Sequence, residues 1–168
     1  MTYYLAVDIG ASSGRHIIGW QENGKICDRE VYRFYNGVEQ TDGHLTWNIA
    51  NLFREVKAGI REAFRLYPEI ASLSIDTWGV DYGLIDKNGR LMSNPTHYRD
   101  TRTLGIGSYM DQFMTAEEIY NTTGIQAIDF NTLNQLGAEM RDDPDALARA
   151  EKLLFIPDLL NYFLTGKM

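Results

Sequence analysis

Short apolar runs separated by turn residues open the chain, and they predict three consecutive β-strands. We expect these strands at residues 3–8, 15–21 and 25–34. Asn23-Gly24 offers a two-residue hairpin turn between the second and third strands, because both residue types tolerate a positive φ. Residues 36–44 are polar and contain glycine, so they are predicted to form a loop.

A long amphipathic helix is predicted next. Its apolar stripe recurs with helical spacing and consists of Ile49, Leu52, Phe53, Val56, Ile60, Ala63, Phe64 and Tyr67. Asn48 is the expected N-cap and Pro68 ends the helix. We interpret the stripe as core packing. Residues 71–76 then form a fourth strand parallel to the first, because a long helix is the usual crossover between parallel strands.

The second half of the chain is predicted to begin with a hairpin and to continue mainly as helices. An extended run at 80–85 turns at Asn88-Gly89 toward 90–92. The remaining predicted elements are, in chain order, a helix at 101–113, a helix from the capping box Thr115–Glu118 to Gly124, a helix marked by Leu133, Leu136 and Met140, a short helix opened by Asp143-Pro144, a strand at 152–156 and a helix at 157–164 that Gly166 ends.

The bend between the first two strands is the main candidate for chemistry. Gly10 and Gly14 flank small residues, so several backbone N–H groups lie close together with the hydroxyls of Ser12 and Ser13 beside them. Asp8 ends the preceding strand. We interpret the bend as a phosphate cradle for a nucleotide polyphosphate and a divalent metal. A plain hairpin bend is the alternative, and neither a P-loop motif nor the dinucleotide-binding glycine motif is present.

A second acidic segment follows the fourth strand. Asp8 and Asp76 would project from neighbouring strands toward one crevice, at the strand ends where α/β proteins bind ligands. Gly79 would let a small ligand approach the backbone beside the flat side chain of Trp78. The alternative is a glycine-rich turn with the tryptophan in the core.

The order of these elements is typical of the ribonuclease-H-like, or actin-like ATPase, fold, which has an acidic residue at the end of its first strand beside a phosphate-binding hairpin. The role of a third polar group, His97-Tyr98-Arg99-Asp100, remains open: Arg99 and Asp100 could pair with each other or reach the hydroxyls of a sugar.

The composition of the chain excludes some classes of binding partner and site. The net charge of −7 argues against nucleic acid and anionic membranes, which require clustered Lys and Arg. Cys27, the single cysteine, excludes a disulfide framework and is expected to be half-buried in a strand, and the three histidines show no metal-ligand spacing. With no secretory signal and no apolar run of membrane-spanning length, a cytoplasmic protein of one domain is predicted.

Several segments together resemble the FGGY family of carbohydrate kinases. They are Asp8–Arg15, Asp76–Tyr82, Tyr98-Arg99-Asp100 and Leu164-Thr165-Gly166-Lys167. The segments Leu45-Thr46-Trp47-Asn48, Gly124-Ile125-Gln126 and Phe130–Leu136 are similar to the members that act on L-rhamnulose. The resemblance covers the whole chain and implies an α/β, ribonuclease-H-like domain with a mixed sheet.

The resemblance also implies an activity and its residues. The enzyme would transfer the γ-phosphate of ATP to the 1-hydroxyl of L-rhamnulose, with Mg²⁺. ATP would contact Ala11, Ser12, Ser13, Gly14 and Arg15. Asp8 would act on the metal through water and Gly79 would contact the sugar, with Asp76, Trp78 and Arg99 lining the same crevice.

One departure from the family pattern limits these expectations. The family's general base is an Asp in a His-Asp segment, and this chain has no His-Asp pair. The resemblance therefore puts the base, the last strand of the first lobe and the whole second lobe beyond Met168, so that residues 1–168 form an incomplete N-terminal lobe. We expect this chain alone to lack sugar-kinase activity and to self-associate through its uncovered strand edge and apolar faces. Another FGGY ketose or polyol kinase, or a non-catalytic actin-like nucleotide- or sugar-sensing module, are the alternatives.

Overall fold

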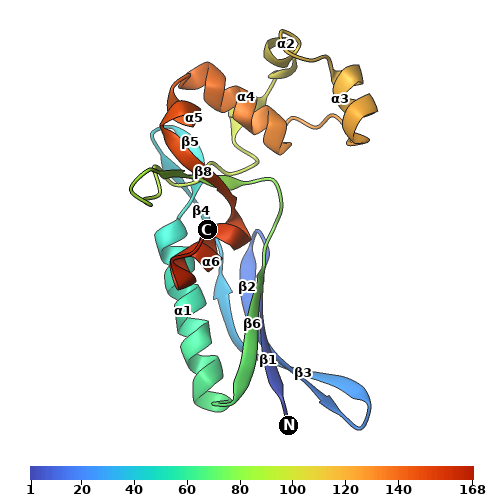
Figure 1. Cartoon of the computed structure of the whole chain (residues 1–168), viewed down its shortest axis with the longest axis vertical. Helices are drawn as coiled ribbons and strands as arrows, with labels where there is room; N and C mark the ends of the chain where they lie inside the picture. Colours follow the sequence, from blue (N-terminus) through green and yellow to red (C-terminus); the bar gives the residue numbers. More distant parts are fainter. The chain divides into compact units, whose positions relative to one another are not determined.

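The computed structural model describes residues 1–168, which form two compact units. Unit 1 contains Met1–Val38, Asn48–Gly79 and Ile156–Met168. Unit 2 contains Glu39–Trp47 and Val80–Phe155. Each unit is therefore assembled from segments that are far apart in the sequence, as the colours of Figure 1 show.

Unit 1 is built on a four-stranded mixed sheet with the strand order β3-β2-β1-β6. Its strands are β1 (Tyr3–Ile9), β2 (Ser13–Glu22), β3 (Lys25–Tyr35) and β6 (Ile70–Asp76). The pairs β1–β2 and β2–β3 are antiparallel, whereas β1 and β6 are parallel. The predicted strands, the Asn23-Gly24 turn, with φ of 50° and 78°, and the parallel crossover are thereby confirmed.

Two helices belong to the same unit. The helix α1 (Ile49–Leu66) runs beside the sheet and α6 (Ile156–Thr165) contacts β6 (Figure 1). Alternate residues of β1 and one stripe of α1 are buried, as their periodicities predict. The side chain of Asn48 accepts a 2.8 Å hydrogen bond from the amide of Asn51, so the predicted N-cap is confirmed.

His16 of β2 packs directly against the backbone of α1. Its side chain is fully buried, and Nε2 lies 3.1 Å from the carbonyl oxygen of Val56. The contact depends on Gly59, because a Cβ atom there would lie 2.2 Å from the imidazole ring. Burial lowers the pKa of His16, and the hydrogen bond to Val56 offsets this only in part.

Unit 2 contains two short antiparallel strand pairs and several helices. The strands are β4 (Val38–Thr41), whose first residue still belongs to unit 1, with β5 (His44–Trp47), and β7 (Tyr82–Asp86) with β8 (Ala150–Phe155). The helices are the 3₁₀ turn η1 (Thr101–Thr103), α2 (Gly107–Met110), α3 (Ala116–Thr123), α4 (Thr132–Asp142) and α5 (Ala146–Arg149). Tyr82, Leu84 and Ala146 form one of its apolar clusters, and Ile106, Met110 and Ala138 form another.

The predicted loop at 36–44 is wrong. The strands β4 and β5 form a hairpin here, and it turns at Asp42 and Gly43 with φ of 53° and 86°. Asp-Gly is a strong signal for a two-residue hairpin turn, so the sequence carried the information. The hairpin was not predicted because its strands are short and mainly polar.

The predicted helix at 101–113 is also wrong. It is divided into η1 and α2, because Gly105 adopts a positive φ of 68° between them. The predicted hairpin at Asn88-Gly89 is present, because the amides of Asp86 and Met92 donate to the carbonyl oxygens of Arg90 and Leu84 at 2.9 Å each. Residues 90–92 add one isolated bridge, between Ile85 and Leu91, and β7 also pairs with β8.

The short helix α5 begins two residues later than predicted. Asp145, and not Asp143, is its N-cap residue. The carboxylate of Asp143 instead forms an ion pair with Arg149.

Several further local predictions are confirmed. Thr115 and Glu118 form a reciprocal capping box, and Gly124 ends α3 with a φ of 69°. The strand predicted at 152–156 and the closing apolar helix are present as β8 and α6. Cys27 is half-buried in β3. Among the helices, none has the length and apolarity that a bilayer crossing requires.

Candidate functional site

Two carboxylates lie at the same edge of the unit 1 sheet. Asp8 of β1 is the register partner of Asp76 in the parallel strand β6. The prediction that these residues end neighbouring strands is confirmed. Both residues reach solvent, and carboxylate oxygens are ligands that Mg²⁺ prefers.

The bend after β1 is held closed by hydrogen bonds. The amide of Gly10 donates to the carbonyl oxygen of Ser13 at 2.9 Å. Asn36 clamps the bend twice, because its Nδ2 donates to the Gly10 carbonyl at 2.9 Å and its amide donates to the Ser12 carbonyl at 3.0 Å. The bend is thus a shaped element with defined backbone positions. Asn36 was not predicted as part of the bend, because it lies 26 residues from Gly10 and carries no local signal.

Gly14 has a different reason to be glycine than the bend itself. It lies in β2 opposite Phe34 of β3, and its φ is not positive. A Cβ atom at this position would lie 2.1 Å from Cζ of Phe34. The absent side chain therefore makes room for an aromatic ring under the strand that leaves the bend.

Arg15 and Asp8 form an ion pair across β1 and β2. Both side chains are partly open to solvent, with exposed fractions of 43% and 42%. Such a pair contributes at most about 1 kcal/mol to stability. The two groups are therefore available to exchange partners for an anionic ligand and a cation.

The segment after β6 presents an open stretch of backbone. Gly79 is exposed, and no atom lies within 4 Å of the position that its Cβ would occupy. Trp78 beside it is half-buried. Val80 follows with a φ of 69°, which is a strained conformation for a β-branched residue. The structure therefore gives Gly79 the accessibility that the sequence analysis expected.

Arg99 belongs to unit 2, apart in the chain from the other expected site residues, which all belong to unit 1. It lines a cavity of about 310 Å³ together with Tyr98, Asp129 and Phe130. The rings of Tyr98 and Phe130 meet edge to face at 5.6 Å, and the guanidinium of Arg99 lies 5.3 Å from the Tyr98 ring. Aromatic walls with a few charged groups are typical of a site for a small polar ligand.

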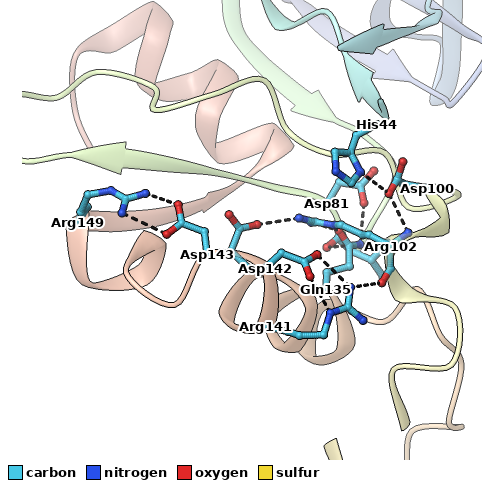
Figure 2. A network of polar contacts seen from close by, with 11 residues as sticks. His44, Asp81, Asp100, Arg102, Gln135, Arg141, Asp142, Asp143 and Arg149 are labelled. Atoms are coloured by element: carbon cyan, nitrogen blue, oxygen red, sulfur yellow. Dashed lines mark hydrogen bonds and ion pairs between the residues drawn. The ribbon is translucent and has the colours of Figure 1, made fainter. Parts of the chain in front are cut away.

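A buried polar network adjoins this cavity. Asp81 is fully buried, and its Oδ2 accepts hydrogen bonds from Trp47 Nε1 at 2.6 Å and from the Tyr98 amide at 3.2 Å. Its Oδ1 accepts from Nε2 of Gln135 at 2.8 Å. Figure 2 shows Asp81 and Gln135 within the larger set of polar contacts of unit 2. Asp81, Trp47 and Gln135 lie in segments that carry the family resemblance, but none of them was expected to have a role of its own in a site.

Asp100 does not pair with Arg99, which was one of the two possibilities left open from the sequence. Its carboxylate accepts hydrogen bonds from His44 Nδ1 at 3.0 Å, from the Leu45 amide at 2.7 Å and from the Arg102 amide at 2.9 Å (Figure 2). Burial acts to raise the pKa of Asp100, but these hydrogen bonds outweigh it, so the pKa is lowered. The carboxylate is thus ionised and committed to holding β5. The nearest polar partner of the Arg99 guanidinium is instead the Tyr98 hydroxyl at 3.4 Å.

Comparison with known proteins places these features in a family. The profile described as "FGGY family of carbohydrate kinases, N-terminal domain" matches residues 3–168. The rhamnulokinase of Lactiplantibacillus plantarum is 42% identical over 166 residues, which cover 99% of this chain and 33% of that protein. The rhamnulokinase of Enterococcus faecalis is 44% identical over 165 residues, which cover 98% of this chain and 33% of that protein. The chain thus spans about a third of the length of these curated relatives.

A solved structure agrees at the level of the fold. The ligand-bound xylulose kinase from Lactobacillus acidophilus superposes with a TM-score of 0.80 at 18% identity, covering 99% of this chain and 34% of that one. The predicted α/β architecture with a mixed sheet, as found in sugar kinases of the actin-like ATPase fold, is therefore confirmed. From this likeness and the profile match over residues 3–168, the chain belongs to the FGGY family of carbohydrate kinases.

Proposed function

We propose that this chain is the N-terminal part of a kinase that transfers the γ-phosphate of ATP to the 1-hydroxyl of L-rhamnulose. The observation that carries the proposal is the pairing of Asp8 with Asp76 at the sheet edge beside the clamped bend. The identity of about two fifths with rhamnulokinases supports the choice of sugar. Phosphoryl transfer depends mainly on positioning and charge stabilisation, and both features serve those ends.

The bend supplies the proposed contacts to ATP. Residues Ala11 and Ser12 form its tip, and no hydrogen bond from their amides to another protein group is present. Ser13, Gly14 and Arg15 continue into β2. Amides grouped in such a bend bind phosphate oxygens, and Arg15 adds a positive charge.

The carboxylates at the strand ends fit a metal that is bound together with phosphates. The structure contains no group of three or more His, Cys, Asp or Glu side chains that could hold a metal by itself. Mg²⁺ typically keeps several waters and uses one or two carboxylates plus substrate phosphates. Asp8 would hold it, through water, with Asp76 beside it; when bound, Mg²⁺ neutralises charge on the phosphates.

The sugar would contact the chain at Gly79, with Asp76, Trp78 and Arg99 as further lining. The open backbone at Gly79 supports this part of the proposal. A binding panel tests it: nuclear magnetic resonance titrations of the chain with L-rhamnulose, D-xylulose and glycerol. We expect L-rhamnulose to bind most tightly and to perturb the amide of Gly79. Equal or stronger binding of another sugar would favour a different ketose or polyol kinase.

The activity of the chain by itself is a separate matter. Because it has no His-Asp pair to supply the general base, we propose that residues 1–168 alone do not turn over. A coupled assay of ADP release with L-rhamnulose measures this directly, and turnover near that of a rhamnulokinase would contradict the proposal. The gene sequence downstream of residue 168 gives a second test, since we expect it to continue into a His-Asp segment. A cytoplasmic location stays a prediction.

A further inference from the structure

We propose that Asp81 and Gln135 are positioning residues for sugar binding: buried themselves, they fix the two aromatic walls of the cavity that contains Arg99. The inference rests on the proposed function, which makes Arg99 part of the sugar site. It adds Tyr98 and Phe130 as the walls and names the groups that hold them.

The first wall is held by Asp81. Its carboxylate accepts a hydrogen bond from the backbone amide of Tyr98, the residue that precedes Arg99. The same oxygen accepts from the indole Nε1 of Trp47, a fully buried side chain of β5. The position of the Tyr98–Arg99 segment is therefore fixed by a buried side-chain acceptor.

The second wall is held by Gln135 of α4. Its Nε2 donates to the backbone carbonyl of Phe130 at 3.0 Å and to Oδ1 of Asp81 at 2.8 Å. One amide group thus joins the Phe130 backbone to the carboxylate that holds Tyr98. The backbone segments that carry the Tyr98 and Phe130 rings are therefore linked through the side chains of Asp81 and Gln135.

Both side chains that form this link, those of Asp81 and Gln135, are fully buried. Asp81 has an exposed fraction of 0% and Gln135 of 1%, and neither lines the cavity. A buried carboxylate is costly unless its oxygens are hydrogen-bonded, and here both oxygens accept from N–H groups. Fully satisfied networks of this kind specify one local arrangement. The neighbouring Val80, held in a strained conformation, has a carbonyl that accepts from Thr132 Oγ1 at 2.9 Å, which is consistent with a rigidly determined site.

The chemistry of the cavity suits the proposed substrate. The rings of Tyr98 and Phe130, with Leu104 and Ile128, give apolar surface, and Arg99 and Asp129 give charged hydrogen-bonding groups. L-rhamnulose is a deoxy sugar with a methyl group beside its hydroxyls, so it presents both kinds of surface. Apolar walls distinguish one sugar from another only weakly, and they do so best when their positions are fixed. We propose that Asp81 and Gln135 fix these positions.

The test uses variants of the 168-residue chain that cut the link at chosen points. In Gln135→Leu the donor to Phe130 is lost, while Asp81 keeps its bonds to Trp47 and Tyr98. In Asp81→Asn the side-chain NH₂ group replaces one of the two oxygens that accept from Trp47, Tyr98 and Gln135. Because an NH₂ group cannot accept, at least one of these hydrogen bonds is lost. Gln112→Leu and Asp111→Asn make the same chemical changes at exposed positions of unit 2 and are the matched controls.

Nuclear magnetic resonance of the ligand-free chain reads the position of each wall. We expect Gln135→Leu to shift the amide of Asn131, whose peptide group contains the Phe130 carbonyl, more than the amide of Tyr98. We expect Asp81→Asn to shift the Trp47 indole or the Tyr98 amide as well. The double variant Asp81→Asn with Gln135→Glu restores a donor–acceptor pair between the two side chains in reverse. It should return Tyr98 toward the wild-type position but not Asn131.

Binding measurements then separate positioning from general structural support. We expect L-rhamnulose affinity to fall about tenfold in Gln135→Leu, as for the loss of one strong hydrogen bond, with MgATP affinity unchanged. The controls should match the wild type in both. Unaltered Tyr98 and Asn131 resonances, wild-type sugar affinity, or equal loss of sugar and MgATP binding in the folded variant would each overturn the positioning role. Absence of L-rhamnulose binding by the wild type would instead count against the proposed function. If Asp81→Asn does not fold, Gln135→Leu decides alone.

Discussion

The ring of Phe34 lies where the side chain of any residue other than glycine at position 14 would have to be. A Cβ atom at Gly14 would lie 2.1 Å from Cζ of Phe34 and 2.4 Å from its Cε1. Phe34 is buried, and the two residues are register partners in β2 and β3. The strand that leaves the proposed phosphate bend is therefore fixed by an aromatic contact as well as by the hydrogen bonds of Asn36.

Gly14→Ala should destabilise unit 1 and weaken nucleotide binding. The methyl group forces the buried ring or the strand to move, and overpacking of this kind costs about 1–3 kcal/mol. Urea denaturation measures the free energy of unfolding, and titration with MgATP measures the binding. Phe34→Leu in the same chain should recover part of the loss, because the smaller side chain leaves room for the methyl. A Gly14→Ala variant with wild-type stability would show that the contact is not restrictive.

Gly59→Ala should destabilise the chain although alanine favours helices. The gain in helix propensity is about 1 kcal/mol, but the added Cβ would lie 2.2 Å from the His16 imidazole, which α1 holds in the core. We expect the cost of the clash to exceed this gain, so that the free energy of unfolding measured by urea denaturation falls by about 1–2 kcal/mol. Gly107→Ala is the control, because no atom lies within 4 Å of its added Cβ. The account of this contact is wrong if Gly59→Ala is as stable as that control.

His16 should make the chain less stable as the pH falls below 6.5. The hydrogen bond to Val56 requires a proton on Nε2, and Nδ1 is buried without a partner, so a second proton is disfavoured. The folded pKa is lowered from 6.5, and the unfolded state therefore binds more protons below that pH. The contribution is complete above pH 6.5 and declines as the pH falls toward the folded pKa. A histidine titration by nuclear magnetic resonance should give His16 a midpoint below 6.5; a midpoint at or above it contradicts the prediction.

The chain should self-associate at high concentration. Several large apolar side chains of unit 2 are exposed, among them Leu104 at 64%, Phe113 at 60% and Ile125 at 58%. Large apolar side chains that are exposed to water favour association. Light scattering over a range of concentrations measures the average mass. A constant monomer mass throughout would argue against this prediction.

Local signals in the sequence predicted most elements, and the two wrong elements, the loop at 36–44 and the helix at 101–113, both lie at turns that contain a glycine with a positive φ. The stripe of α1 and the capping box at Thr115 need only neighbours within a few residues, so both are confirmed. The helix predicted at 101–113 failed at Gly105, a poor helix former whose left-handed conformation divides the segment.

In the site, by contrast, the contacts that the sequence did not predict join distant residues. The rule for parallel strands was enough to align Asp8 with Asp76. The clamp from Asn36 to Gly10 joins residues 26 positions apart, and the bond from Gln135 to Asp81 joins residues 54 positions apart. No periodicity or local motif encodes such pairings, so only the folded chain reveals them.

Mapping of MgATP onto the chain tests the central claim most directly. Amide resonances of the labelled protein are followed by nuclear magnetic resonance during titration with MgATP, since binding by this chain alone is expected to be weak. The account predicts the largest shifts at residues 10–15 and at Asp8, with smaller shifts in Gly14→Ala at the same concentrations. Shifts that fall elsewhere in unit 1 or in unit 2, while residues 10–15 stay unperturbed, would contradict it.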